Sequence, residues 1–384
     1  MALIAALALA VLVPLGAGQA GGASQRGYGT GPPPSTGKAP RLNHIFIIVL
    51  ENEDATTSFG PKSEAPYLAK TLRRKGEFLP NYYGTGHNSL DNYISMISGQ
   101  APNTQTQADC PIFAPFTPGT PTADGQFVGS GCVYPPGVET VANQLEDSGY
   151  TWRGYMQDMA KGTPKSCRHP AIGSPDSTQS ARKGDQYAAR HNPFVYFHSI
   201  IDFPTCAKND IDLKYLQKDL KRGRTTPSYS FITPNLCYDG HDAPCVDGKP
   251  GGLKSANVYL KKWVPRITHS PAFRNRGLLI VTFDEATITD SSACCNEKPG
   301  PNLVPPNTPG GIIPGPGGGR VGAVVLSPCL KAGTVTKTPF NHYSMLRSVE
   351  DNFGLSHLGY AGQKGLVPFG RAVLNKPSCR GGRY

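Results

Sequence analysis

The sequence lacks several patterns that would assign it to a protein class at once. It has no Cys-x-x-Cys pair, which excludes a zinc ribbon and a thioredoxin-like motif. It has no dense run of lysine and arginine and no basic array interleaved with aromatic side chains, so nucleic acid is not an expected partner. After the N-terminal apolar run, no stretch is long and apolar enough to span a membrane, and no internal repeat is present. We therefore expect no stable membrane insertion.

Charged residues are scarce, at 17% of the chain, and they are unbalanced. The formal net charge of +11 favours anionic partners such as phosphorylated substrates or acidic lipid headgroups, although a positive balance is often only a solubility trait. With 384 residues and 38% hydrophobic residues, the chain can bury a sizeable core, in one large domain or two smaller ones. The 45 glycines and 37 prolines predict many turns and long loops.

The chain opens with an apolar run that ends in small residues, MALIAALALAVLVPLGAGQA. This run predicts a signal peptide over residues 1–23, cleaved near Ala20 or Ala23, and hence a secreted, extracellular protein. A membrane anchor is the alternative, but Pro14 and the shortness of the run argue against a spanning helix. Residues 24–40, rich in glycine, proline and serine, predict a flexible linker.

The chain contains 10 cysteines, an even number. Behind a signal peptide, this count predicts an oxidising compartment and disulfides that involve up to all of the cysteines. The spacing alone does not fix the pairing. The short or terminal pairs that we consider plausible are Cys110–Cys132, Cys237–Cys245 and Cys329–Cys379.

Strand-like and helix-like segments alternate along the chain. Continuous apolar runs rich in β-branched residues are typical of strands buried on both faces. Such strands are predicted at 44–50, 278–283 and 321–328, with further strands at 150–156 and 228–235. Helices are predicted at 65–75, from Ser89 to about Gly99, and at 138–148, 211–222, 256–267 and 341–355, with a long loop at 286–319. The alternation predicts an α/β protein with a largely parallel sheet.

The segment His87–Gly99, HNSLDNYISMISG, places a serine at the start of a predicted helix. Leu90, Tyr93 and Ile97 follow Ser89 at helical spacing, and a glycine-containing loop precedes it. The N-terminus of a helix offers free N–H groups and a partial positive charge that suit a phosphate, so a hydroxyl there could attack phosphorus. The alternative is that Ser89 is an ordinary helix N-cap.

Polar pairs follow two of the predicted buried strands. Glu51-Asn52 comes after the strand at 44–50, and Asp284-Glu285 comes after the strand at 278–283. In an open parallel sheet, ligand sites gather at the carboxyl ends of the strands, so we expect these side chains to meet. Their oxygens suit a divalent cation such as Ca²⁺, Mg²⁺ or Mn²⁺. The alternative is that each pair is only a solvated strand end.

Histidines form the next candidate group, because an imidazolium can stabilise a phosphoryl group or protonate a leaving oxygen. His87 lies two residues before Ser89, His241 lies in the segment DGHDAPC, and His342 begins the last predicted helix. His191, in the segment RHNPF, is the other histidine that we single out. A single histidine is more often structural than catalytic.

The segments IVLENE, GHNSLDNYISMISG, SFITPNLCYDGHD, LLIVTFDEA and NHYSMLRSVEDNFGL occur in this order. Together they resemble the phosphoesterase family of secreted bacterial and fungal acid phosphatases and phospholipases C, within the alkaline-phosphatase-like superfamily. The similarity runs from about His44 to about Leu355. It implies an alkaline-phosphatase-like α/β/α sandwich with a mostly parallel central sheet and long disulfide-clipped loops, in a catalytic domain over residues 41–384.

The resemblance also implies a ligand set and a nucleophile at the matching positions. Glu51, Asn52, Asp284 and Glu285 would hold a divalent metal cation. Ser89 would be the nucleophile and a further ligand of the metal.

The resemblance assigns phosphate contacts to the residues around Ser89. Asn92, on the same helix face, would hydrogen-bond a phosphoryl oxygen. The histidines that would surround the phosphate are His87, His241 and His342, and Asp239 and Asp242 would orient His241. The family often has proline where this chain has Asn88 and Asp91, and Asp91 adds negative charge next to the nucleophile.

These observations predict a secreted, metal-dependent phosphatase that hydrolyses phosphate monoesters through a phosphoserine on Ser89. Its substrate would be a phosphorylated small molecule or a phosphoinositide, which the positive charge of the chain would favour. The first alternative is a phospholipase C-type phosphodiesterase acting from the same site. The second is a non-catalytic extracellular protein that binds anions. The oligomeric state, the identity of the metal and the natural substrate are left open.

Overall fold

The computed structural model of the protein describes residues 39–376 and Cys379. The predicted signal peptide at 1–23 and nearly all of the predicted linker at 24–40 lie outside the described residues. The catalytic domain over residues 41–384 stays a prediction. Within the part of the chain that is described, no helix is both long and apolar enough to cross a bilayer.

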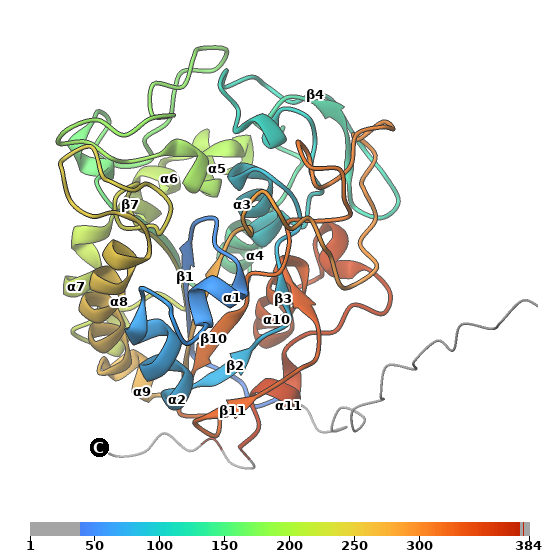
Figure 1. Ribbon diagram of the computed structural model, residues 1–384. Coiled ribbons are helices and arrows are strands. Elements are labelled where there is room, and N and C mark those ends of the chain that lie inside the picture. The colour runs from blue at the N-terminus through green and yellow to red at the C-terminus, as the bar shows by residue number, and fades with distance from the viewer. Residues whose placement is uncertain (1–38, 377–378, 380–384) are drawn as a thin grey trace, which may run out of the picture. The chain divides into compact units, whose positions relative to one another are not determined.

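An eight-stranded sheet forms the centre of the described chain, with strand order β11-β2-β10-β9-β1-β8-β6-β7 (Figure 1). The strands are β1 (His44–Leu50), β2 (Glu77–Leu79), β6 (Trp152–Met156), β7 (Asp210–Asp212), β8 (Tyr229–Thr233), β9 (Gly277–Phe283), β10 (Ala323–Leu326) and β11 (Thr334–Val335). β1 pairs in parallel with both β9 and β8, whereas β10 runs antiparallel to its neighbours β9 and β2. The predicted α/β class with a mostly parallel sheet is confirmed.

The remaining strands form small sheets. β3 (Tyr82–Tyr83) pairs in parallel with β12 (Phe340–Asn341), and β4 (Thr117–Pro121) pairs with β5 (Phe127–Ser130) as an antiparallel hairpin. The α-helices are α1 (Ala55–Phe59), α2 (Arg73–Lys75), α3 (Ser89–Ser98), α4 (Val141–Asp147), α5 (His198–Ile201), α6 (Pro204–Asn209), α7 (Leu216–Asp219), α8 (Gly252–Thr268), α9 (Pro271–Arg274), α10 (His342–Phe353) and α11 (Gly370–Val373). A π-helical segment, Tyr67–Leu72, leads directly into α2.

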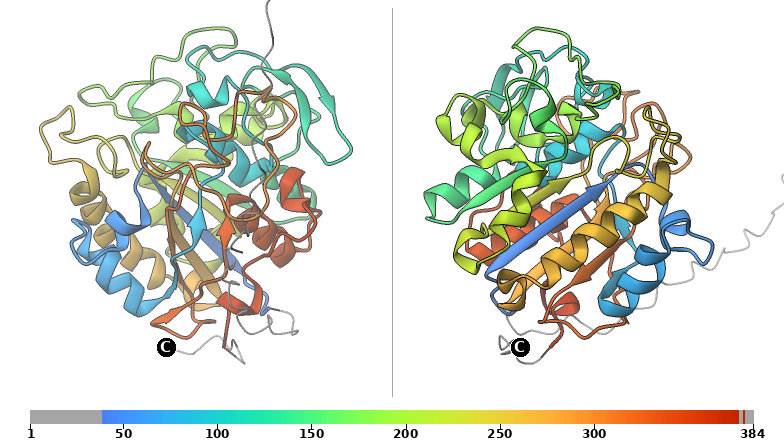
Figure 2. Two further views of the ribbon diagram at one scale, coloured as in Figure 1. Left: turned by 45° about the vertical axis from the view of Figure 1, so that its right-hand side comes forward. Right: turned by 90° about the vertical axis from the view of Figure 1, so that its left-hand side faces the viewer.

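Helices cover both faces of the central sheet, as the two views of Figure 2 show. On one face α3 packs against α4 and α10, and its Tyr93 meets Phe231 of β8, with ring centroids 6.0 Å apart. On the other face, where α1 and α8 lie, Phe283 of β9 meets Phe59 of α1 at 6.4 Å. The β1 register puts Phe231 level with Ile280, three residues before Phe283, so the two contacts fall on opposite faces.

Most of the predicted elements are found in the structure, and one prediction was wrong. Residues 211–222 do not form a continuous helix: Asp210–Asp212 pairs with β6 as β7, and only Leu216–Asp219 is α-helical. The side chain of Asp212 accepts hydrogen bonds from the backbone of Lys214 and Ala160, which ends the strand and starts the following turn. Pairing with a neighbouring strand therefore overrides the local helical pattern.

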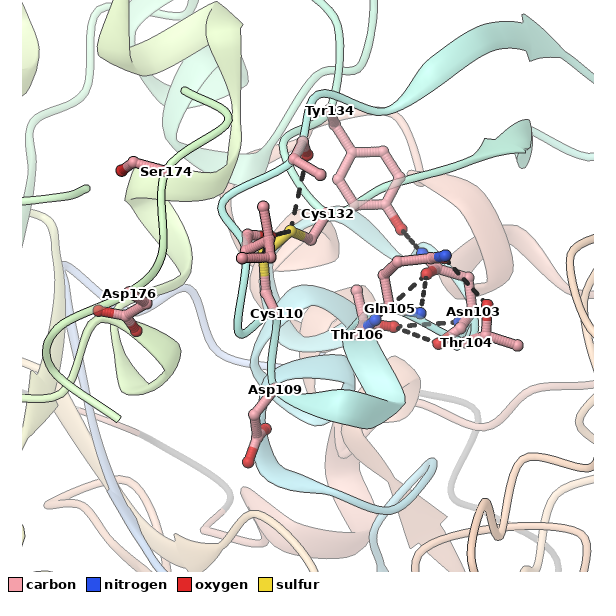
Figure 3. Close-up of a disulfide and its surroundings, with 12 residues drawn as sticks. Asn103, Thr104, Gln105, Thr106, Asp109, Cys110, Cys132, Tyr134, Ser174 and Asp176 are labelled. Carbon is pink, nitrogen blue, oxygen red and sulfur yellow. Dashed lines mark hydrogen bonds between the residues drawn. A yellow bond between two sulfur atoms is a disulfide. The ribbon is translucent and has the colours of Figure 1, made fainter. Parts of the chain in front are cut away.

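Disulfides link the long loops to this frame. The predicted pairs Cys110–Cys132, Cys237–Cys245 and Cys329–Cys379 are confirmed, and Cys167–Cys206 and Cys294–Cys295 are also formed. The disulfide Cys110–Cys132 holds the loop that follows α3, and Asp109 lies next to it (Figure 3). Asp109 accepts a hydrogen bond from the backbone of Leu90 at 2.9 Å, so this loop supports the start of α3.

Candidate active site

The hydroxyl of Ser89 lies at the carboxyl ends of β1 and β9. Ser89 is the first residue of α3, and Asn88 takes the N-cap position, so the interpretation of Ser89 as an N-cap is wrong. The buried Ser89 Oγ donates a hydrogen bond to Glu51 Oε2 at 2.7 Å. Its hydroxyl is therefore directed at the residue that follows β1 rather than at its own helix.

Carboxylates and an amide from two strand ends surround this hydroxyl. Glu51 accepts hydrogen bonds from Ser89 and from the hydroxyl of Tyr93, and Asp284 accepts one from the backbone N–H of Asn52 at 3.1 Å. Asp284 Oδ2 and Asn52 Oδ1 are buried and have no hydrogen-bond partner in the described part of the chain. The polar pairs after β1 and β9 thus meet, as expected for neighbouring parallel strands.

A further carboxylate, Asp239, comes from the loop after β8. Its backbone carbonyl accepts a hydrogen bond from the N–H of Glu51 at 3.0 Å, and its buried Oδ2 lies 4.0 Å from His191 Nδ1 and has no hydrogen-bond partner among the described residues. Sequence reasoning gave Asp239 only the role of orienting His241. Asp239 Oδ1 does accept a hydrogen bond from the backbone N–H of His241 at 3.0 Å, so it contacts both Glu51 and His241.

Burial and the negative charges of nearby aspartates raise the pKa values of these carboxyl groups. Burial is the largest cause for each, and it raises the pKa of Asp284 to about 7 and that of Asp239 to about 8. The pKa of Glu51 is raised well above its ordinary value by burial and then by the charges of Asp284 and Asp239. Arg190 is a nearby cation, but its Nε lies 3.5 Å from Asp109 Oδ2. The cluster therefore concentrates negative charge that a bound cation would neutralise.

These oxygens fit a divalent cation by their chemistry. Carboxylate, amide and hydroxyl oxygens are hard ligands, and unpartnered buried oxygens are costly unless something binds them. Among the described residues, no three carboxylate, imidazole or thiol groups of this site have ligand atoms within 4.8 Å of one another. A cation here would therefore depend on Asn52 and Ser89 as well as on Glu51 and Asp284.

Glu285 and His87 bind each other beside this cluster. Both side chains are buried, and Glu285 Oε2 is paired with His87 Nδ1. His87 Nε2 lies 3.0 Å from the carbonyl of Asp290, so both ring nitrogens have partners. The backbone N–H of His87 also donates to Pro309 in the long loop after β9. His87 thus links the loop before Ser89 to the loop that follows Glu285.

His342 and Asn92 are fully engaged with the protein. Burial lowers the pKa of His342 to about 4, and its ring nitrogens lie 3.0 Å from the Tyr82 hydroxyl and 2.5 Å from the carbonyl of Asp284. Asn92 accepts hydrogen bonds from the N–H groups of Thr85 and Gly86 and donates to the carbonyls of Gly86 and Asn88. Each of the two residues therefore holds a backbone segment next to the site.

His241 is the histidine of this group that solvent reaches. More than half of its side chain is exposed, and its Nδ1 lies 3.2 Å from Asp242 Oδ1. The hydrogen bond with Asp242 is the largest cause that raises the pKa of His241, and the charges of Asp239 and Asp284 add to it. This imidazole is therefore charged more readily than an ordinary one and stands at the open side of the carboxylates.

Two residues near the nucleophile were not assigned a role from the sequence. His191 is buried, stacks on Tyr93 with ring centroids 5.4 Å apart, and its Nε2 lies 3.2 Å from Glu51 Oε2. Arg190 contacts Asp109, whose other oxygen supports the start of α3. The segment RHNPF drew attention to His191, but no pattern in the sequence placed it next to Glu51.

Asp91 lies in the first turn of α3, and the structure buries both of its oxygens without partners. Burial, and then the charges of Asp109 and Asp284, raise the pKa of Asp91 well above its ordinary value. A Cβ atom at Gly86 would come within 2.5 Å of Asp91 Oδ2, so a larger residue there would require the Asp91 side chain to move. Asp91 thus packs against the loop before the nucleophile.

The comparisons with known proteins agree with this geometry. Residues 61–356 match the Phosphoesterase family. The chain is 27% identical over 319 residues to a probable acid phosphatase of Kluyveromyces lactis, covering 83% of this chain and 60% of that protein. It is 24% identical over 322 residues to the phosphatidylinositol-3-phosphatase of Mycobacterium tuberculosis, covering 84% and 80%.

Solved structures with similar folds were also found. A protein of a Bacteroides thetaiotaomicron locus for glycosaminoglycan metabolism aligns with a TM-score of 0.50 at 10% identity, covering 88% of this chain and 82% of that one. A protein in the alkaline phosphatase superfamily from Vibrio parahaemolyticus aligns with a TM-score of 0.47 at 12% identity, covering 84% and 68%.

The chain is therefore a member of the Phosphoesterase family, and the family predicted from its motifs is confirmed. The predicted α/β sandwich is confirmed by the sheet and the helices on its two faces. The chain spans 60% of the length of the Kluyveromyces lactis protein and 63% of the phosphate-repressible acid phosphatase of Penicillium chrysogenum.

Proposed function

We propose that this protein is a secreted, metal-dependent phosphatase that hydrolyses phosphate monoesters through a phosphoserine on Ser89. One observation carries the proposal. The buried hydroxyl of Ser89, the first residue of α3, donates a hydrogen bond to Glu51 within a group of carboxylates that have no counterion among the residues described. The free N–H groups of the helix start would hold phosphoryl oxygens. The similarity to acid phosphatases supports the choice of phosphate monoesters.

The residues that would hold the cation are Glu51, Asn52, Ser89, Asp284 and Glu285, with His87 fixing the orientation of Glu285. A bound divalent cation would lower the pKa of the serine hydroxyl and neutralise charge on a phosphoryl oxygen. We infer that Ca²⁺, Mg²⁺ and Mn²⁺ are the candidates, because the donors are oxygens.

In the first step, Ser89 Oγ attacks phosphorus while its proton passes toward Glu51 Oε2, which already accepts it in a hydrogen bond. The bond from phosphorus to the alcohol oxygen breaks, and His241 is the group that we assign to protonate this oxygen. Water then attacks the phosphorus of phosphoserine and gives a proton to His241, while the proton taken up by Glu51 restores the serine hydroxyl as phosphate leaves.

The remaining residues of the predicted site would hold its other groups in position. We propose that Asn92 and His342 are positioning residues: Asn92 holds the loop before Ser89, and His342 holds the backbone of Asp284. His87 would do the same for Glu285. The direct phosphate contacts first predicted for these residues would require their present hydrogen bonds to break.

The second candidate function is a phospholipase C-type phosphodiesterase. The chain is 25% identical over 281 residues to a hemolytic phospholipase C of Pseudomonas aeruginosa, covering 68% of this chain but 35% of that protein. Because the resemblance to acid phosphatases covers more of the chain, we favour monoesters, phosphoinositides included.

The test is hydrolysis of p-nitrophenyl phosphate and bis(p-nitrophenyl) phosphate between about pH 4 and about pH 9, with and without chelator. We expect metal-dependent release of nitrophenol from the monoester and its loss in Ser89→Ala. Turnover of the diester alone would favour the phosphodiesterase. Binding of inorganic phosphate with no turnover of either ester would favour the non-catalytic anion-binding protein.

A further inference from the structure

A cleft of about 570 Å³ lies beside the proposed active site and shares His241 with it. It is formed by α1, the segment after α1 and the loop that carries His241. The side chains that matter for its chemistry are those of Glu53, Thr56, Thr57, Lys62 and His241. Its volume lies in the range of pockets that bind small organic molecules.

His241 connects this cleft to the proposed site. It lines the cleft, and its charge interacts with Asp284 and Asp239 on one side and with Glu53 on the other. Glu53 follows the proposed ligands Glu51 and Asn52 directly in the chain. An alcohol oxygen protonated by His241 would therefore belong to a group that can occupy the cleft.

The lining of the cleft has hydrogen-bonding capacity that the protein does not use. Among the described residues, no hydrogen bond or ion pair engages the side chains of Glu53, Thr56, Thr57 and Lys62. By contrast, the other carboxylate of the cleft, Glu64, is bound to a lysine outside it at 3.0 Å. No aromatic side chain lines the described cleft, so an aryl group would find no ring to stack on.

We propose that this cleft is the subsite for the alcohol part of the substrate and that it takes a polyhydroxylated group of the size of a sugar or a cyclic polyol. This inference rests on the proposed function. The Glu53 carboxylate accepts from neighbouring hydroxyls, Lys62 donates to hydroxyl oxygens, and Thr57 does either. Charge-assisted hydrogen bonds of this kind distinguish a polyol from an aryl group of similar size.

Binding to Ser89→Ala tests the cleft without turnover. We would titrate this variant, in the presence of excess divalent cation, with glucose 6-phosphate, phenyl phosphate and inorganic phosphate in a calorimeter. We expect glucose 6-phosphate to bind about tenfold more tightly than either of the others, because it alone can bond to the lining of the cleft. Adding Lys62→Ala or Thr57→Val should remove most of this advantage.

The matched control is Lys208→Ala, which removes an exposed lysine of α6 that does not line the cleft. It should leave the preference for glucose 6-phosphate as it was. The subsite proposal is overturned if glucose 6-phosphate binds no more tightly than inorganic phosphate, if Lys62→Ala has no more effect than Lys208→Ala, or if no anion binds. Wild-type turnover of p-nitrophenyl phosphate tests the proposed function separately, so either proposal can fail alone.

Discussion

Two sets of acidic side chains lie at different parts of the same sheet, and they differ in whether the protein supplies them with hydrogen-bond partners. Near β6 and β7, Asp219 accepts hydrogen bonds from Arg153 and the Tyr155 hydroxyl, and both oxygens of Asp212 bind backbone N–H groups. Next to β1 and β9, Asp284 and Asp239 each keep a buried oxygen without a partner. The first set is neutralised by the protein, and the second is not.

This difference teaches which carboxylates serve the fold and which serve a ligand. A buried carboxylate without a counterion costs free energy, and a fold retains such groups where something else binds them. Asp212 and Asp219 need nothing more. Those around Ser89 are compensated only by a cation or a ligand that brings positive charge or protons.

The largest expected effect is that of Ser89→Ala on turnover. Removing a nucleophile should lower kcat for p-nitrophenyl phosphate by about a thousandfold or more. The midpoint of thermal unfolding should stay near that of the wild type, because the substitution removes only one small hydroxyl, which faces the Glu51 carboxyl group. Ser98→Ala, on the same helix, is the control, since that hydroxyl bonds to the carbonyl of Ile94. Full activity of Ser89→Ala would show that another group attacks phosphorus.

The second prediction tests the difference between the two sets of acidic side chains directly. Asp284→Asn should lower kcat by about a hundredfold or more and remove bound divalent cation, measured by elemental analysis, because a charged ligand is lost. Its partner variant, Asp219→Asn, should instead reduce the free energy of unfolding by about 2 kcal/mol and keep kcat, since it weakens the bond to Arg153. Cation retained in Asp284→Asn would contradict the proposed ligand set.

A smaller effect is expected for His241→Asn, which tests the proton donor. Loss of a general acid should lower kcat by about a hundredfold for alkyl phosphates, and less for p-nitrophenyl phosphate, whose leaving group needs no proton. Because the bond to Asp242 raises the pKa of His241, wild-type activity should fall as the pH rises through that pKa, and the variant should lose this limb. His198→Asn removes a partly exposed histidine that is likewise paired with an aspartate, Asp202, and should keep the wild-type profile.

The smallest effect concerns Asp210, a buried carboxyl of β7. Burial raises its pKa to about 8, so the folded protein binds a proton between about pH 4 and about pH 8 that the unfolded chain does not. Stability is therefore lost as the pH rises through this window. Asp210→Asn should increase the free energy of unfolding by about 1 to 2 kcal/mol at pH 8 and leave it nearly unchanged at pH 4, as urea titrations at both pH values would show. Equal effects at the two pH values would contradict the raised pKa.

Much of the site could be predicted because strand ends are easy to locate. The apolar runs at 44–50 and 278–283 identify neighbouring strands, and the residues that follow them must emerge at one edge of the sheet. This reasoning placed Glu51, Asn52 and Asp284 near one another before their contacts were known. Asp239 follows a third such strand and could have been added to the set by the same signal.

The directions of the side chains could not be predicted in this way. Nothing in the sequence indicates that Glu285 turns to His87 or that His342 supports the backbone of Asp284. Both pairs join residues far apart in the chain, so their geometry depends on how several elements pack together. The same reason explains β7, where pairing with β6 replaced the first residues of the predicted helix.

By itself the sequence determined the family, the order of the main strands and helices, and the position of Ser89 at a helix start, because periodic apolar patterns and short motifs are local properties. Only the tertiary structure decided which carboxylates are left without partners, which histidine stays exposed and where a cleft opens beside it. Those properties arise from burial and from contacts between distant segments, and no local pattern records them.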